Sequence, residues 1–143
     1  MNRRLLLSMA ALAVVTTAVG SAHAGSYLDR ASLLVEGSAR DARSLRARLT
    51  DKELARVVQM VADARAKAAS KMDVPAVVAK AHPHLLLTLS RVERAAAAAL
   101  EGNLKGSLEL LEAARREETI FRAVLKEAGH PLPAPAARAS VGA

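Results

Sequence analysis

The side chains best suited to bind a metal are concentrated in one short segment, His82-Pro83-His84. Imidazole nitrogen binds zinc, copper and nickel. Pro83 is compatible with a helix start, where the chain could bring both rings together. A stable site uses three or four ligands, and no H-x-x-x-H or E-x-x-H motif accompanies the pair. The segment therefore has two interpretations: a site for a divalent transition metal, or a histidine N-cap followed by proline and one exposed histidine.

Two carboxylates further along the chain could contribute to such a site. Glu117 and Glu118 fall at helical spacing among leucines and valines, so at least one carboxylate lies at the edge of an apolar face. If the last two helices form a hairpin, Glu118 comes within one turn of the position opposite His82. We therefore expect a His82–Glu118 contact, with Glu118 as the third candidate metal ligand. The alternative is a structural ion pair of Glu118 with Arg115 or Arg122, since an unpaired buried carboxylate is costly.

A second candidate surface is basic. Arg40, Arg43 and Arg46 repeat every three residues and predict a basic ridge on the first helix. Such a ridge can bind a polyanion or another acidic partner. It can equally be a solvated helix face, because Asp41 lies within it.

Composition excludes several kinds of chemistry. The chain has no cysteine, which excludes disulfides, thiolate catalysis and the C-x-x-C-H attachment of a c-type haem. Tyr27 and Phe121 are its only aromatic residues, which argues against nucleic acid as a partner, because single-stranded binding uses aromatic stacking platforms. No G-x-S-x-G motif or glycine-rich phosphate loop is present. The sequence therefore predicts a protein that is not an enzyme and needs no cofactor, unless the two histidines hold a metal.

The first 24 residues predict export. Arg3 and Arg4 precede an apolar run over 5–19, and the segment closes on Ala22-His23-Ala24. A basic start, an apolar stretch and an A-x-A site are the three parts of a secretory signal peptide. We expect cleavage after Ala24, a periplasmic or secreted protein, and no transmembrane span after cleavage. The full chain carries a net charge of +7, a balance that suits acidic partners.

The rest of the chain predicts helices. Ala, Leu, Arg and Glu dominate it, and these residues favour helix. Thr50 to Glu53 reads as a capping box, and Gly102-Asn103 as a helix stop followed by a new N-cap. The expected helices cover about 26–49, 50–71, 83–100 and 104–128, with a short turn over 74–81 that Asp73 caps. In the second helix, the expected buried face includes Leu54, Val57, Val58 and Val61.

These elements predict an all-α protein. Four helices with short connections form an antiparallel up-and-down four-helix bundle, here over residues 25–129. The segment 130–143 is rich in proline and alanine and is expected to be a disordered tail. The sequence favours a small exported bundle that acts by contact with a protein or envelope surface, with homodimerisation left open. Metal binding or metal sensing through His82 and His84 is the alternative function.

Overall fold

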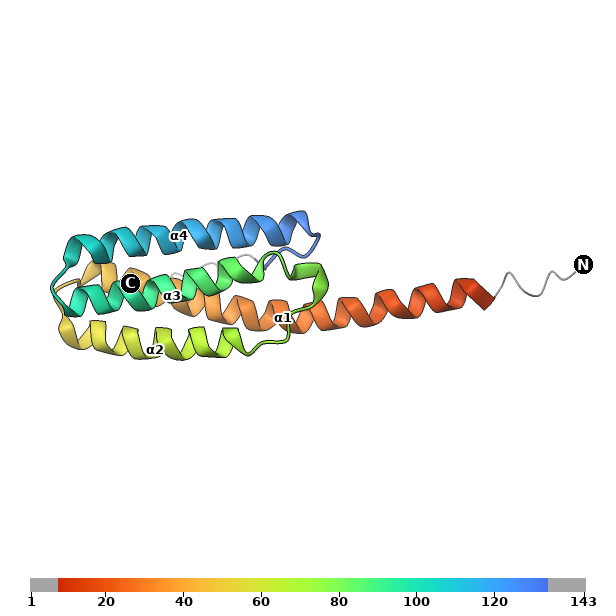
Figure 1. The fold of residues 1–143 in the computed structure, drawn as a ribbon, viewed down its shortest axis with the longest axis horizontal. Coiled ribbons are helices and arrows are strands. Elements are labelled where there is room, and N and C mark those ends of the chain that lie inside the picture. Colours follow the sequence, from red (N-terminus) through yellow and green to blue (C-terminus); the bar gives the residue numbers. More distant parts are fainter. Residues whose placement is uncertain (1–7, 134–143) are drawn as a thin grey trace, which may run out of the picture.

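The described part of the chain is entirely helical. The computed structural model describes the backbone of residues 8–133 and the side chains of residues 24–133. It contains four α-helices, a single 3₁₀ turn (η1) and no strand within residues 8–133: α1 Ser8–Ala47, α2 Lys52–Ser70, η1 Ala76–Val78, α3 His82–Leu100 and α4 Leu104–Glu127. The four helices lie side by side, and consecutive helices run in opposite directions (Figure 1). The predicted all-helical, four-helix architecture is confirmed.

Two predicted segments extend past the described residues. Residues 1–7 of the expected signal peptide and residues 134–143 of the expected tail lie outside them. The helix α1 begins at Ser8 rather than near Ser26, and its first part projects beyond the other helices (Figure 1). Cleavage after Ala24 therefore stays a prediction. Among the described residues, no helix has both the length and the apolar character needed to cross a bilayer.

The helices do not pack equally closely. Helix α3 makes its most extensive contacts with α4 and α2, whereas α1 is packed more loosely against all three. Phe121, Leu125 and Tyr27 belong to one core cluster, which lies near the start of α3 and the end of α4 and against the middle of α1. The other cluster is rich in alanine: Ala55, Ala62, Ala95, Ala96, Ala99 and Ala114. Small side chains at a contact allow helix axes to approach more closely, which explains the tight α2–α3–α4 unit.

The buried face of α2 agrees with the prediction only in part: Val58 is buried and Leu54 packs against the core, as predicted, but two other valines are not. Val57 and Val61 are 56% and 37% exposed, while Ala55, Val58 and Ala62 are almost completely buried. Both stripes follow helical spacing, so periodicity alone could not choose between them. The face with Ala55, Val58 and Ala62 lies inward, where it packs in one cluster with the alanines of α3.

The predicted helix ends in the second half of the chain are confirmed. Gly102 has φ +78°, in the left-handed region. The amide of Gly102 donates to the Ala99 carbonyl and that of Asn103 to the Ala98 carbonyl, as in a Schellman motif. Asn103 then caps α4, because its side chain accepts from the Gly106 amide at 2.9 Å. Gly129 closes α4 in the same way, with φ +81°.

Three other predicted helix starts were wrong. The N-cap of α2 is Asp51, whose carboxylate accepts from the Leu54 amide at 3.0 Å, and not Thr50. The turn η1 has Pro75 at its N-cap position and no side-chain cap, so Asp73 does not cap it. His82 is the first residue of α3, and the N-cap is Ala81. The chain reaches α3 directly from a helical turn, so the residue before Pro83 stays in helical geometry despite its usual preference for extended angles.

Candidate functional site

The two histidines of the His-Pro-His segment have different surroundings. The Nδ1 atom of His82 lies 2.9 Å from the Tyr27 hydroxyl, and the two rings are tilted by 59° with centroids 5.7 Å apart. Burial lowers the pKa of His82, and a hydrogen bond to the Ala69 backbone partly opposes this shift. A neutral ring with its proton on Nε2 satisfies both contacts, because Nδ1 then accepts from Tyr27 and Nε2–H donates to Ala69. His82 thus links the start of α3 to the middle of α1 and to the end of α2.

Burial also determines the protonation state of Tyr27, the partner of His82. Its side chain is 2% exposed, and burial raises the pKa of its phenol to about 12. The hydroxyl is therefore a neutral donor at physiological pH. Sequence reasoning noted Tyr27 only as one of two aromatics, and no local pattern marks it as the partner of a residue 55 positions away.

His84 belongs to an ion-pair network on the seam between α3 and α4. Its Nδ1 lies 2.7 Å from Glu117 Oε2, while Arg91 Nη1 donates to Glu117 Oε1 at 2.8 Å. The same Arg91 nitrogen also donates to the Ala113 carbonyl at 3.1 Å. The hydrogen bond from His84 is the largest influence that holds the pKa of Glu117 below its ordinary value, with Arg91 adding to it and burial opposing it. Glu117, and not Glu118, is therefore the carboxylate that meets a histidine.

The expected contact between His82 and Glu118 is not the one that forms. Glu118 accepts from Arg122 Nε at 2.9 Å within α4, which confirms the arginine partner considered as the alternative. On α4, the predicted Glu118 and the observed Glu117 are adjacent, and a step of one residue on a helix rotates a side chain by about 100°. Within residues 24–133, no group of three or more His, Cys, Asp or Glu side chains is placed to hold a metal ion. Metal binding by His82, His84 and Glu118 stays a prediction for experiment.

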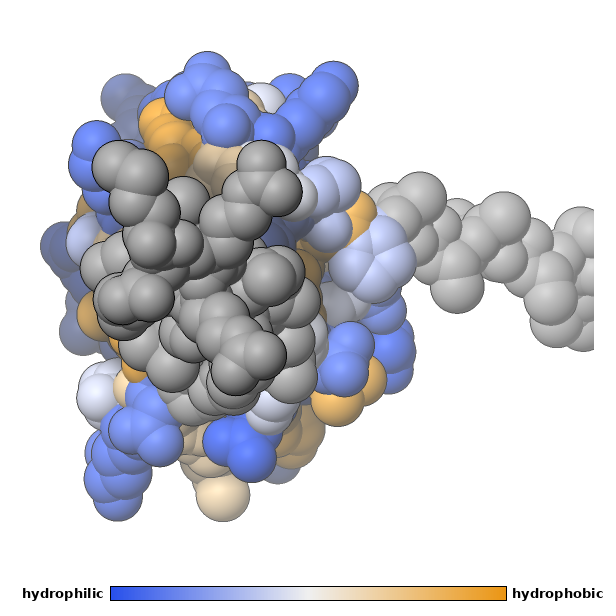
Figure 2. Space-filling view, turned by 90° about the vertical axis from the view of Figure 1, so that its right-hand side faces the viewer, coloured by the Kyte–Doolittle hydropathy of each residue, from blue (hydrophilic) through white to orange (hydrophobic). Residues whose placement is uncertain are grey.

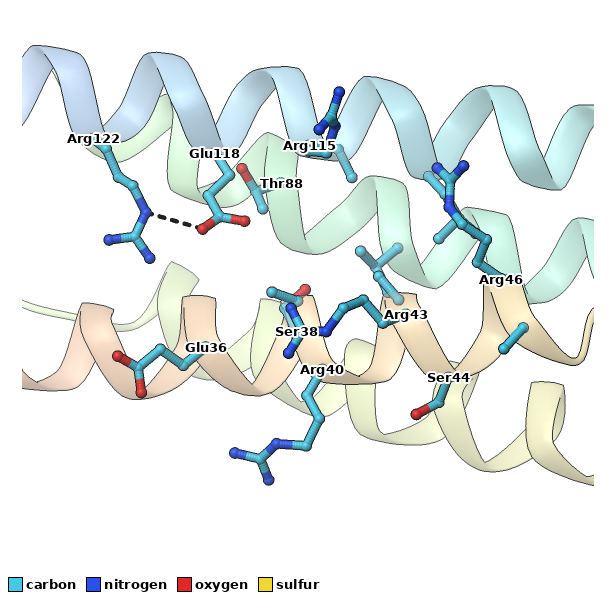
Figure 3. Close-up of a pocket in the computed structure, with 16 residues that line it drawn as sticks. Glu36, Ser38, Arg40, Arg43, Ser44, Arg46, Thr88, Arg115, Glu118 and Arg122 are labelled. Carbon is cyan, nitrogen blue, oxygen red and sulfur yellow. Dashed lines mark hydrogen bonds and ion pairs between the residues drawn. The ribbon is translucent and has the colours of Figure 1, made fainter. Parts of the chain in front are cut away.

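The three arginines of the predicted ridge lie along α1 and are exposed. A step of three residues turns a helix by about 300°, so the three side chains fan around the axis instead of forming a straight line. Arg40 points away from α4, Arg43 runs along α1 toward Ser38, and Arg46 points toward α4 (Figure 3). Arg46 pairs with Glu112 of α4 at 3.6 Å. Arg40 and Arg43 take part in none of the ion pairs found among residues 24–133.

The ridge borders a cleft between α1 and α4. This cleft has a volume of about 800 Å³, and its lining carries five arginines and two glutamates. Val92, Leu111, Ala114 and Ala42 provide apolar surface in it. The cleft exists because α1 is packed loosely against α4. Seen from the end of the bundle, hydrophilic side chains project outward with hydrophobic surface between them (Figure 2).

One polar group in the cleft has no hydrogen-bond partner. Ser38 is 1% exposed, and its hydroxyl is one of two buried side-chain oxygens without a partner in the described region. Thr88 of α3 also lines the cleft, but its hydroxyl donates to the His84 carbonyl. An unpaired buried hydroxyl costs about 1–3 kcal/mol. The Ser38 hydroxyl is closed to solvent, so it lies beneath the cleft and not on its open surface.

The sequence pointed to part of this arrangement and missed the rest. Spacing identified the basic ridge, but nothing local predicts that Arg115 and Arg122 of α4 line the same cleft. Ser38 carried no signal, because serine within a helix is ordinary. Comparison of the chain with protein-family models, with curated proteins and with solved structures gives no match in any of the three.

Proposed function

We propose that this chain is a small exported helical bundle without catalytic activity, which acts by contact with an anionic component of the cell envelope. The observation that carries the proposal is the α1–α4 cleft, whose lining has three more arginines than glutamates. A concave site of one charge sign raises the local concentration of ligands of the opposite sign. The signal-peptide pattern of residues 1–24 supports the proposal, because it predicts export to the compartment where such a component is found.

Two arginines at the border of the cleft have no carboxylate partner among the described residues. Arg40 and Arg43 are exposed and take no part in the ion pairs of the described residues. An acidic group that approaches them does not have to displace an internal carboxylate. By contrast, Arg122 is already paired with Glu118.

Binding to lipid vesicles tests this function. The wild-type protein is expected to co-sediment with vesicles that contain phosphatidylglycerol, but not with phosphatidylcholine vesicles, and to dissociate as salt rises because the contact is electrostatic. The double variant Arg40→Glu/Arg43→Glu should lose this binding. The matched control is Lys80→Glu/Lys126→Glu, which reverses two exposed charges outside the cleft lining. Equal binding by both double variants, or no binding by the wild type, would contradict the proposal.

Binding of a transition metal through His82 and His84 is the alternative function. Calorimetric titration with Zn²⁺ at pH 7 separates the two functions, because only the metal function predicts a heat of binding. The affinity for Zn²⁺ should also fall below about pH 6.5, as protons compete for imidazole. Loss of the heat of binding in both His82→Ala and His84→Ala would support the metal function. An unchanged isotherm in either variant would argue against it.

A further inference from the structure

Helix α2 carries a second apolar face that stays exposed at the edge of the bundle (Figure 1). Steps of three and four residues place five exposed side chains on one side of the helix: Val57, Met60, Val61, Ala64 and Ala68. None of these positions is charged, although charged residues make up 24% of the chain. The solvent face of a helix is typically polar, so this face is suited to contact with another protein.

The spacing of this face is symmetric. Four of its residues follow one another at intervals of four, three and four: Val57, Val61, Ala64 and Ala68. A second copy of α2 that runs antiparallel therefore matches Val57 with Ala68 of that copy, and Val61 then faces Ala64. Each layer of the contact holds one larger and one small side chain, which allows the two helices to approach evenly. A parallel copy would set valine against valine and alanine against alanine.

The charges at the two ends of the face favour the same direction. Glu53 and Lys71 are eighteen residues apart, which is about five helical turns, so they lie on one side of α2. An antiparallel copy brings Glu53 beside Lys71 at both ends of the contact, whereas a parallel copy brings like charges together. Glu53 also contacts Arg56 of its own helix at 2.7 Å, and a carboxylate can accept from a second donor. Lys71 takes part in none of the ion pairs found among residues 24–133.

We propose that the exposed face of α2 is the interface of a symmetric homodimer, in which two α2 helices pack antiparallel. The contact is limited to one face of a 19-residue helix, and interfaces of less than about 1,200 Å² are weak and transient. We therefore expect a dimer that forms at micromolar or higher concentrations. No residue of α2 lines the α1–α4 cleft, so the dimer does not depend on the proposed function.

A bilayer is the alternative cover for this face. Helices that lie in a membrane interface bury Trp, Phe or Leu and carry Lys and Arg on their polar side. The exposed face of α2 has none of these three apolar residues, and one of its two end charges is negative. A second copy fits the face better than a lipid surface does.

Sedimentation velocity from about 1 µM to about 1 mM protein tests the dimer. The wild type is expected to change from monomer to dimer within this range. Val57→Glu should weaken dimerisation at least tenfold, because a symmetric contact buries the new charge twice. The matched control is Val77→Glu, which alters a valine of η1 with similar exposure, 53% against 56%. A wild type that stays monomeric, or equal dissociation constants for the two variants, would overturn the proposal.

A pair of opposite charges tests the direction of packing. Ala68→Lys alone should also weaken the dimer. The double variant Val57→Glu/Ala68→Lys should regain most of the affinity, because the antiparallel layer sets the new glutamate opposite the new lysine. The two positions are about three turns apart in one chain, so the rescue cannot arise within a single helix. A double variant that dimerises no better than either single variant would overturn the antiparallel arrangement.

Folding and vesicle binding of the variants are measured in parallel. At dilute concentration, where the protein is monomeric, Val57→Glu should melt at nearly the temperature of the wild type, because residue 57 is exposed. A large drop in this temperature would mean that residue 57 belongs to the core and would overturn the proposal. If the wild type stays monomeric while Val57→Glu abolishes vesicle binding, the face contacts a bilayer and the homodimer is wrong.

Discussion

Helix α2 starts at a single side chain. The Asp51 carboxylate accepts from the Leu54 amide at 3.0 Å and satisfies one of the free amides of the first turn. Asp51→Ala is therefore expected to cost about 1 kcal/mol of unfolding free energy, whereas Thr50→Ala should be nearly neutral. Urea denaturation of both variants measures the difference.

The Asp51 prediction has a conservative control. Asp51→Asn keeps an oxygen acceptor for the cap and removes the charge that faces Arg48 at 3.5 Å. It should retain most of the stability, since asparagine caps helices as well as aspartate does. A larger loss in Thr50→Ala than in Asp51→Ala would show that the cap is Thr50 after all.

His82 makes the stability of the fold depend on pH. Burial lowers its pKa in the folded state below the ordinary value of 6.5. The unfolded chain therefore binds more protons in this range, so the stabilisation is complete above pH 6.5 and is lost as pH falls toward the lower folded pKa. The melting temperature of the wild type should fall more between pH 7.5 and 5.5 than that of His82→Asn. Parallel pH profiles for the two proteins would contradict this assignment.

At the scale of an element, α2 has two apolar stripes and buries one of them. Val58 is 3% exposed and Val57 is 56% exposed. Val58→Ala removes two buried carbons, and we expect a cost of about 2 kcal/mol. Val57→Ala should stay within about 0.5 kcal/mol, as surface substitutions usually do. The two neighbouring valines serve as matched controls, and equal losses in thermal or urea denaturation would mean that α2 is rotated from the described position.

Gly37 leaves room at the surface of α1 for an arginine side chain of α2. A Cβ atom added at Gly37 would lie 2.8 Å from an Arg65 guanidinium nitrogen, and Arg65 pairs with Asp41 of the same helix α1. The glycine lets Arg65 cross α1 on its way to Asp41. Helix propensity alone assigns a mid-helix glycine a modest cost, and the contact with Arg65 becomes visible only in the tertiary structure.

At the scale of the whole molecule, the predicted cleavage site lies next to the folded core. Ala24 is fully buried and Tyr27 is 2% exposed, so cleavage after Ala24 removes one buried residue but leaves Tyr27, the partner of His82, in the mature chain. We expect the mature protein from native expression to begin at Gly25. Its melting temperature should equal that of a chain produced from residue 25 onward. N-terminal sequencing with intact-mass measurement checks this. A cytoplasmic species that retains Met1 would contradict the export prediction.

The sequence by itself determined the helical class, the number of helices and the helix ends at Gly102, Asn103 and Gly129. These properties are local: helix propensity, apolar periodicity and the left-handed tolerance of glycine depend on a few neighbouring residues. The basic ridge of Arg40, Arg43 and Arg46 was also visible, because charges at fixed spacing share a helix.

Only the tertiary structure decided which face of each helix is buried and which side chains meet. His82 pairs with Tyr27 and His84 with Glu117, across separations that no local pattern encodes. On α2, two stripes had helical spacing, and the choice depended on the alanine face of α3. The cleft depends on how loosely α1 lies against α4. Helix rotation and interhelical distance follow from how the side chains of several helices fit together, and an error of one residue moves a contact to a different side chain.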